Sequence, residues 1–144
     1  MIRNLIYISK VTQELSKIEI KELLFKARIK NRENQITGFL ICKEGYFIQW
    51  IEGPSQNIEN LLADLLNDKR HHSLKVVLDR VLETPIFDNW RMLYLPELLN
   101  FEKCDFEHVY NSNGDGDILE CINLIEFDSL SQFKEFREYN DIAV

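Results

Sequence analysis

The sequence is poor in the features that mark specialised classes of protein. Five Gly and three Pro in 144 residues exclude a fibrous or low-complexity chain. No run of 18 apolar residues occurs, so we expect no membrane-spanning helix and no membrane association. Arg3 and Asn4 interrupt the apolar core that a signal peptide needs, and the cysteines (Cys42, Cys104 and Cys121) are odd in number with no Cys-x-x-Cys spacing. These absences predict a reduced, cytoplasmic chain.

Motifs for catalysis and metal binding are also scarce. The sequence has neither a Gly-x-Ser-x-Gly nucleophile motif nor a glycine-rich phosphate loop, so we predict that the chain is not an enzyme. Residues 111–122 resemble the start of a calcium loop, but the twelfth position is Ile, which indicates a turn. His71 and His72 are adjacent and lack a third ligand, so the residues alone favour a solvated helix end, and we predict no metal site. Glu52 is a single carboxylate at a strand end, where it is more typical of a loop anchor than of an acid–base pair.

Charge is distributed unevenly along the chain. The net charge is -7 and the isoelectric point is about 5.0, which argues against a nucleic-acid partner. Residues 1–95 carry a net charge of +2, whereas residues 96–144 carry -9. The length fits one domain with a short appendage. We therefore divide the chain into a domain of residues 1–95 and an acidic C-terminal segment of residues 96–144.

Hydrophobic periodicity predicts strands that alternate with two helices. In the first strand, Leu5 and Tyr7 share one face and Ile6 and Ile8 the other. Ser16 and Glu19 form a capping box that starts the first helix, which we expect to end near Lys30. A second helix is expected to open at Ser55 and to end in the polar run of residues 68–72. The predicted strands span residues 2–8, 36–42, 46–52, 74–82 and 87–94.

This order of elements predicts an α+β, ferredoxin-like βαββαββ sheet. A right-handed crossover makes the second strand parallel to the first, and the third strand fits between them. Both helices then cover one sheet face. Ile6, Ile48 and Trp50 point to the other face, so we expect helical stretches at 97–110 and 128–140, or a partner chain, to cover it.

Three polar residues lie in this apolar frame. Tyr7 and Gln49 lie in the middle of two strands that the predicted topology makes neighbours, and Asn31 lies just past the predicted first helix. A buried Gln with unpaired groups costs about 1–3 kcal/mol per group, and a phenol can satisfy one of them. The residues leave two alternatives open, a structural hydrogen bond or a site for a polar ligand.

Five motifs in this order resemble one known family. They are Tyr7-Ile8-Ser9, Asn31 followed by Ile36-Thr37-Gly38, residues 47–53 (Phe-Ile-Gln-Trp-Ile-Glu-Gly), Asp68-Lys69-Arg70-His71, and Phe87 with Trp90 and Met92. Together they resemble the BLUF domain, the flavin photoreceptor that uses FAD, over about residues 2–95. The resemblance implies a ferredoxin-like fold that holds FAD non-covalently between the two helices.

The resemblance also implies roles for single residues. Tyr7 matches the tyrosine that donates an electron and then a proton to the excited flavin. Gln49 matches the glutamine whose hydrogen bonds then rearrange, and Asn31 matches the asparagine that binds the isoalloxazine edge. Lys30 and Arg32, which flank Asn31, depart from the usual family pattern and leave FMN open beside FAD.

Four further positions match the family near its last strand and second helix. Trp90 and Met92 match residues whose positions report the state of the flavin, and Arg70 and His71 match a basic pair near the cofactor. With the resemblance, a ligand contact for His71 becomes the favoured interpretation. Trp50 stands where an aliphatic residue is common, and we expect it to pack on the opposite sheet face.

We therefore expect a blue-light photoreceptor that is not an enzyme and that signals by protein–protein contact. The downstream partner is unknown, and a homo-oligomer is left open. The alternatives are a ferredoxin-like binding or scaffold module without a photocycle, and a small enzyme acting on a phosphorylated substrate. The missing phosphate-binding motif disfavours the enzyme. The acidic C-terminal segment is the expected output element.

Overall fold

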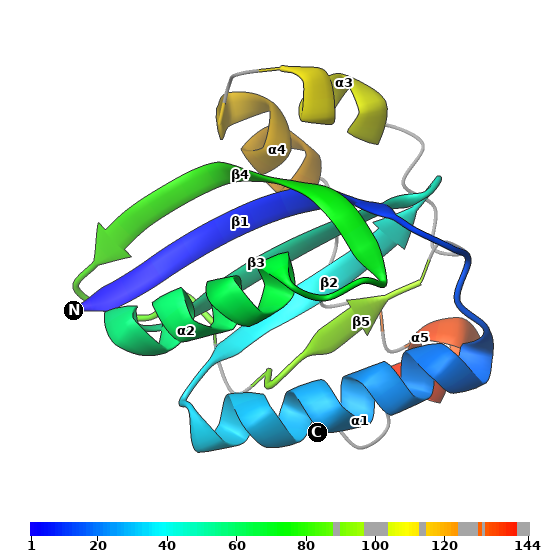
Figure 1. Ribbon diagram of the computed structural model, residues 1–144, viewed down its shortest axis with the longest axis horizontal. Helices are drawn as coiled ribbons and strands as arrows, with labels where there is room; N and C mark the ends of the chain where they lie inside the picture. Colours follow the sequence, from blue (N-terminus) through cyan, green and yellow to red (C-terminus); the bar gives the residue numbers. More distant parts are fainter. Residues whose placement is uncertain (88–89, 97–103, 113–114, 124–129, 131, 141–144) are drawn as a thin grey trace.

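The structure is a computed structural model that describes the chain except for residues 88–89, 97–103, 113–114, 124–129, 131 and 141–144 (Figure 1). The elements are β1 (Ile2–Val11), α1 (Lys17–Glu33), β2 (Thr37–Lys43), β3 (Tyr46–Pro54), α2 (Ser55–Leu66), β4 (His71–Leu82), β5 (Leu93–Leu95), α3 (Phe106–Asn111), α4 (Asp115–Asn123) and α5 (Lys134–Asn140).

The sheet has the predicted ferredoxin-like topology. Its strand order is β4-β1-β3-β2-β5, with β3 antiparallel to both β1 and β2. The third strand therefore lies between the first and the second, as the crossover argument requires. In the β1–β3 register, Tyr7 lies directly opposite Gln49, and both side chains point to the same face. The predicted α+β fold class is confirmed.

Helices α1 and α2 pack on one face of the sheet, which we call the pocket face (Figure 1). Leu24 of α1 and Ile58 of α2 are fully buried there against Leu5, Leu40 and Ile51. Along β1, Leu5 and Tyr7 belong to this cluster and Ile6 and Ile8 to the opposite one, as the period of two predicts. The pocket face therefore has an apolar frame built from both helices.

The N-terminus of α1 is as predicted, but its C-terminus is not. The Ser16 side chain accepts a hydrogen bond from the Glu19 N–H at 3.2 Å, and Glu19 Oε1 accepts one from the Ser16 N–H at 3.0 Å. The helix continues past Lys30 to Glu33, because no Gly or Pro interrupts it and the chain turns only at Gln35, which has a φ of 58°. Asn31 therefore lies in the last helical turn rather than just past the helix.

The opposite sheet face, the far face, is covered by the C-terminal segment. Phe106 of α3 and Ile118 of α4 are at most 1% exposed and pack in one cluster with Ile6, Ile48 and Phe39. The first expected helical stretch is thus confirmed for residues 106–110, while residues 97–103 lie outside the described residues. We call α3 and α4, with the neighbouring Cys104 and Leu130, the C-terminal cover.

The second expected stretch is placed differently from the prediction, although residues 128, 129 and 131 lie outside the described residues. Helix α5 lies beside the edge strand β5 (Figure 1), where Tyr139 contacts Tyr94 with ring centroids 4.9 Å apart. Asn140 holds this edge because its side chain accepts from the Tyr94 N–H and donates to the Tyr94 carbonyl, both at 2.8 Å. The side-chain amide thus satisfies edge-strand groups that need a partner.

Two ends near the second helix differ from the prediction. Helix α2 ends at Leu66, and His71 and His72 instead begin β4, where they pair with Val11 and Lys10 of an extended β1. The two histidines therefore are not a helix end, because the β1 ladder gives their backbone a strand partner. His72 is exposed, as predicted.

The fifth strand is much shorter than predicted. Among the described residues of the expected strand 87–94 and its C-terminal neighbour Leu95, residues 93–95 pair with β2, and residues 88–89 lie outside the described residues. The chain bends at Arg91, and the Trp90 carbonyl accepts from the Gly38 N–H at 2.8 Å ahead of the ladder. The strict alternation of faces therefore does not extend back to Trp90.

The loop that resembles a calcium site has a different structure. The sequence predicted a turn for residues 111–122, but helix α4 begins at Asp115, so the second part of this stretch is helical. Among the described residues, no three His, Cys, Asp or Glu side chains lie close enough to hold a metal ion. In the same part of the chain, no helix has the length and apolar content needed to cross a bilayer.

Candidate functional site

A cavity of about 480 Å³ lies between α1, α2 and the pocket face of the sheet. Its volume is within the usual range for small-molecule sites, and its lining is mostly apolar. Six of the seven site residues expected from the sequence line it: Tyr7, Asn31, Gln49, Arg70, His71 and Met92. Trp90 does not line it.

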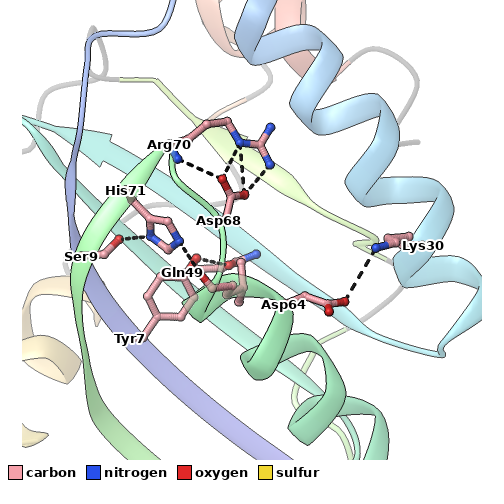
Figure 2. Close-up of polar contacts among 9 residues, drawn as sticks. Tyr7, Ser9, Lys30, Gln49, Asp64, Asp68, Arg70 and His71 are labelled. Atoms are coloured by element: carbon pink, nitrogen blue, oxygen red, sulfur yellow. Dashed lines mark hydrogen bonds and ion pairs between the residues drawn. The ribbon is translucent and has the colours of Figure 1, made fainter.

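Tyr7 and Gln49 form a hydrogen-bonded pair at the floor of this cavity. The Tyr7 hydroxyl donates to Gln49 Oε1, and the two side chains are 2% and 7% exposed (Figure 2). Burial, reinforced by the charge of Asp68 and opposed by Arg70, raises the pKa of Tyr7 far above its usual value of 10. The phenol therefore keeps its proton in the resting protein.

Met92 provides the second contact of the Gln49 amide. Gln49 Nε2 donates to Met92 Sδ at 3.3 Å, and Met92 is 1% exposed. A thioether is a weak acceptor, so this end of the amide is held less firmly than the end that accepts from Tyr7. Exchange of the donor and acceptor ends of the amide would need side-chain rotation without a change in the backbone, and it would break the hydrogen bond from Tyr7.

Asn31 connects α1 to the segment that leads into β5. Its Nδ2 donates to the Arg91 carbonyl at 2.5 Å, and the residue is 3% exposed. Because Asn31 sits in the last turn of α1, its side chain reaches both the cavity and the bend at Arg91. The site therefore includes a direct link between the cavity wall and the start of the last strand.

His71 lies in the cavity wall, where both of its ring nitrogens contact other residues of the chain. Its Nε2 lies 2.7 Å from the Leu65 carbonyl and its Nδ1 lies 2.7 Å from Ser9 Oγ (Figure 2). Because a carbonyl oxygen only accepts, Nε2 carries a proton. The ring centroid lies 6.0 Å from that of Tyr7, so His71 forms part of the wall behind the phenol.

The rim of the cavity carries charges of both signs (Figure 2). Arg70 binds Asp68 through two nitrogens, with Nε–Oδ1 at 2.9 Å and Nη2–Oδ2 at 2.5 Å, and this pairing lowers the pKa of Asp68. Lys30 of α1 and Asp64 of α2 form an exposed ion pair at 3.7 Å between the two helices. Lys26 also lines the cavity.

Sequence reasoning missed Asp64 and gave Asp68 only as part of the motif that contains Arg70, with no role in the site. Asp64 and Lys30 are 34 positions apart, and only the packing of α1 beside α2 brings them together. Asp68 stands two residues before Arg70 after a helix, which is a local turn pattern that could have indicated their contact.

Arg28 is a second site-related residue without a recognisable sequence signal. Its Nε donates to the Met92 carbonyl at 3.0 Å, and its Nη2 donates to the Tyr139 carbonyl and to Asn140 Oδ1 at 3.0 and 3.1 Å. Burial lowers the pKa of Arg28. One guanidinium thus joins α1, the Met92 backbone and α5.

Trp90 lies on the other side of the sheet from the cavity. It stacks on Phe87 with centroids 6.1 Å apart and packs against the far-face cluster. Trp50 packs there too, edge-on to Phe39 and Phe87. The prediction that Trp50 packs on the far face is confirmed.

Glu52 anchors a loop, as the sequence indicated. Its Oε1 accepts from the Phe87 N–H at 2.6 Å and its Oε2 accepts from Asn4 Nδ2 at 3.0 Å, with the residue 1% exposed. Asn4 Oδ1 in turn accepts from Trp50 Nε1 at 2.8 Å. This buried network holds residue 87 against β3.

A ferredoxin-like sheet with a buried phenol–amide pair at the floor of a cavity between two helices has the geometry of a small-molecule binding domain. The sequence matches the family described as BLUF, sensors of blue-light using FAD, over residues 2–93. The chain belongs to this family, whose members are blue-light sensors that bind flavin.

Individual proteins show the same similarity. The photoactivated adenylate cyclase subunit beta of Euglena gracilis is 33% identical over 73 residues, which are 51% of this chain and 8% of that protein. Structures of BlsA in its photo-activated state and of BlrB in its dark state have the same fold. Both have a TM-score of 0.71, with 23% and 22% identity, and cover 85% and 83% of this chain and 93% and 90% of theirs. The match to the cyclase subunit, in contrast, spans less than a tenth of that protein's length.

The residues present fit a flavin. An isoalloxazine is a planar apolar ring system with one polar edge, and the cavity offers apolar walls with the amides of Asn31 and Gln49. Lys26, Lys30 and Arg70 line the same cavity as cations that attract phosphate, and Asp64 and Asp68 line it too and pair with Lys30 and Arg70. The apolar walls and the two amides therefore suit the ring system of a flavin.

Proposed function

We propose that this chain is a blue-light photoreceptor that holds FAD non-covalently in the cavity between α1 and α2. The observation that carries the proposal is the Tyr7–Gln49 hydrogen bond, buried at the cavity floor. Met92, Asn31, Arg70 and the wall residue His71 complete the proposed binding set. FMN shares the ring and one phosphate, and we choose FAD because the family is described by it.

The proposed photochemistry uses Tyr7 as donor and Gln49 as relay. Bound flavin supplies blue-light absorption and, once excited, an acceptor for one electron. Tyr7 would supply that electron and then its phenolic proton, which would pass along the hydrogen bond to Gln49 and on to the same acceptor. Gln49 would reverse its two ends, because its contact with Met92 Sδ is weak, and the electron and proton would then return to Tyr7. The altered hydrogen bonds are the stored signal.

One rearranged hydrogen bond is too small to switch a protein completely. It is worth about 0.5–1.5 kcal/mol, whereas a near-complete change of population needs about 5.5 kcal/mol. We propose that β5 and the acidic C-terminal segment, residues 96–144, amplify the change and pass it to a protein partner. The contacts of Arg28 with the Met92 carbonyl and with α5 support this route. We further propose that residues 1–95 are a sensor without an enzymatic activity of their own.

The absorption spectrum before and after blue light tests the proposed function. We expect purified protein reconstituted with FAD to be yellow and to show a small red shift that reverses in the dark. A protein that stays colourless with FAD and with FMN would contradict the proposal. Yellow protein without a reversible shift would indicate a scaffold module, and phosphate release from model phosphoesters would indicate an enzyme.

Gln49→Leu should retain flavin and lose the red-shifted state. Leucine fills a similar space but lacks the amide that accepts from Tyr7 and donates to Met92. The light-minus-dark difference spectrum measures the effect. Gln56→Leu is the matched control, because this exposed glutamine on α2 donates to Asn60 Oδ1 at 3.1 Å and does not line the cavity. A normal shift in Gln49→Leu would remove the amide from the mechanism.

The substitutions Met92→Leu and Trp90→Ala should show which of these two residues near β5 influences the photocycle. Met92→Leu conserves volume and removes the acceptor for Gln49 Nε2, so we expect dark recovery to change by about 2–10-fold. Trp90→Ala should leave the red shift intact, because Trp90 packs on the far face. Time-resolved absorbance after a light pulse checks both. Flavin loss from Trp90→Ala would instead make Trp90 a wall that supports the cavity.

A further inference from the structure

Two of the three cysteines face each other inside the C-terminal cover. Cys104 comes just before α3 and Cys121 lies in the last turns of α4, and they are 4% and 8% exposed. Cys104 Sγ donates to the Cys121 carbonyl at 3.4 Å. This contact and their shared place in the far-face cluster make the two residues direct neighbours, and burial, followed by the adjacent Cys104 thiol, raises the pKa of Cys121 to about 12.

Cys42 is excluded as a partner by the sheet itself. It lies on β2 and packs with the pocket-face cluster, whereas Cys104 and Cys121 belong to the far-face cluster. The β2 backbone therefore stands between Cys42 and the other two. Of the three cysteines, Cys104 and Cys121 are therefore the two that lie in contact on one face of the sheet.

A cation lies beside this pair. Lys43, at the end of β2, donates from Nζ to the Cys104 carbonyl at 2.7 Å, and its charge acts to lower the pKa of Cys121 against the stronger effect of burial. Thiolates are the reactive form of cysteine and are favoured near cations. When the cover opens and water reaches the pair, desolvation is lost and Lys43 favours the thiolate.

We propose that Cys104 and Cys121 are a redox-active thiol pair that hydrogen peroxide converts to a disulfide linking α3 to α4. One thiolate attacks a peroxide oxygen, which breaks the O–O bond and forms a sulfenic acid and hydroxide. The second thiolate attacks that sulfur, forms the S–S bond and expels the sulfenic oxygen as hydroxide. Together with the two thiol protons, the products are one disulfide and two water molecules. The thiols lose two electrons and the peroxide gains them.

The position of the pair predicts the rate and the consequence of this reaction. Both sulfurs are shielded, so oxidation must wait for local opening of the cover and should be slow in the native protein. The disulfide would then restrict the unfolded chain between residues 104 and 121 and stabilise the cover over the far face. Peroxide would thereby stiffen the segment that covers the sheet opposite the cavity.

The test treats the full chain with hydrogen peroxide and counts thiols in denaturant. The count should fall from three to one, the intact mass should fall by two hydrogen atoms, and dithiothreitol should restore both. Proteolytic mapping should recover a single linked peptide pair containing Cys104 and Cys121. Low urea should speed the reaction, and the melting temperature of the oxidised protein should rise by about 5–10 °C.

Cys42→Ser is the matched control and should give the same disulfide. In Cys104→Ala, the two remaining cysteines should stay as free thiols or become oxidised singly, and no intramolecular disulfide should form. Three of the results would overturn the proposal: an unchanged thiol count, a bond to Cys42 or between chains, and oxidation of single cysteines to sulfinic acid without a link. The wild-type peptide map decides these outcomes even if Cys104→Ala does not fold.

Discussion

Tyr7→Phe is expected to abolish the light-induced red shift while flavin stays bound. The phenyl ring fills the same buried space, so the apolar frame around Leu5 and Leu24 is conserved. The variant lacks the hydroxyl that donates to Gln49, and Phe is far harder to oxidise than Tyr. We expect a loss of the difference spectrum of at least about 100-fold, since an electron donor and its proton path vanish together.

Tyr94→Phe is the matched control for this experiment. Tyr94 is another buried tyrosine on the pocket-face side of the sheet, 3% exposed, but it does not line the cavity. We expect its red shift to be normal. Flavin stoichiometry from the absorbance ratio is measured in both variants. A normal photocycle in Tyr7→Phe would show that another residue supplies the electron.

Phe106→Ala is expected to destabilise the protein by about 3–5 kcal/mol. Phe106 begins α3, is 1% exposed and packs in the far-face cluster with residues of the sheet. Truncation of a buried Phe removes its transfer free energy and leaves a cavity in the cluster. Urea unfolding followed by circular dichroism measures the free energy of unfolding.

Phe133→Ala provides the comparison for the same substitution in the C-terminal segment. Phe133 is 47% exposed, and a change there should stay within about 0.5 kcal/mol. Equal unfolding free energies for the Phe106 variant and the wild type would mean that the cover contributes little to the folded core. The free energy of unfolding of residues 1–95 would then be independent of the segment that follows them.

The strand faces and the order of the sheet were predictable from the sequence. Alternation with a period of two assigns Tyr7 to the opposite face from Ile6 wherever the strand is regular, and the same rule separates Gln49 from Trp50. The capping box at Ser16 was predictable too, because it depends on residues three positions apart. Local patterns are sufficient where the deciding contacts are local.

The ends of elements were less predictable. Asn31 was expected beyond the first helix and lies inside it, and His71 was expected at a helix end and lies in β4. Helix and strand ends depend on which backbone groups find partners, and for His71 that partner is β1, some sixty residues away.

Which residues meet in the cavity was decided by the tertiary structure. Trp90 and Met92 both matched the family pattern, but the bend at Arg91 places Met92 against Gln49 and Trp90 in the far-face cluster. The period-two alternation of the strands and the capping box of the first helix were enough to predict the sheet and the neighbouring positions of Tyr7 and Gln49. The bend, the Asp64–Lys30 pair and the linked positions of Arg28 and α5 depend on contacts between distant segments, which no local pattern encodes.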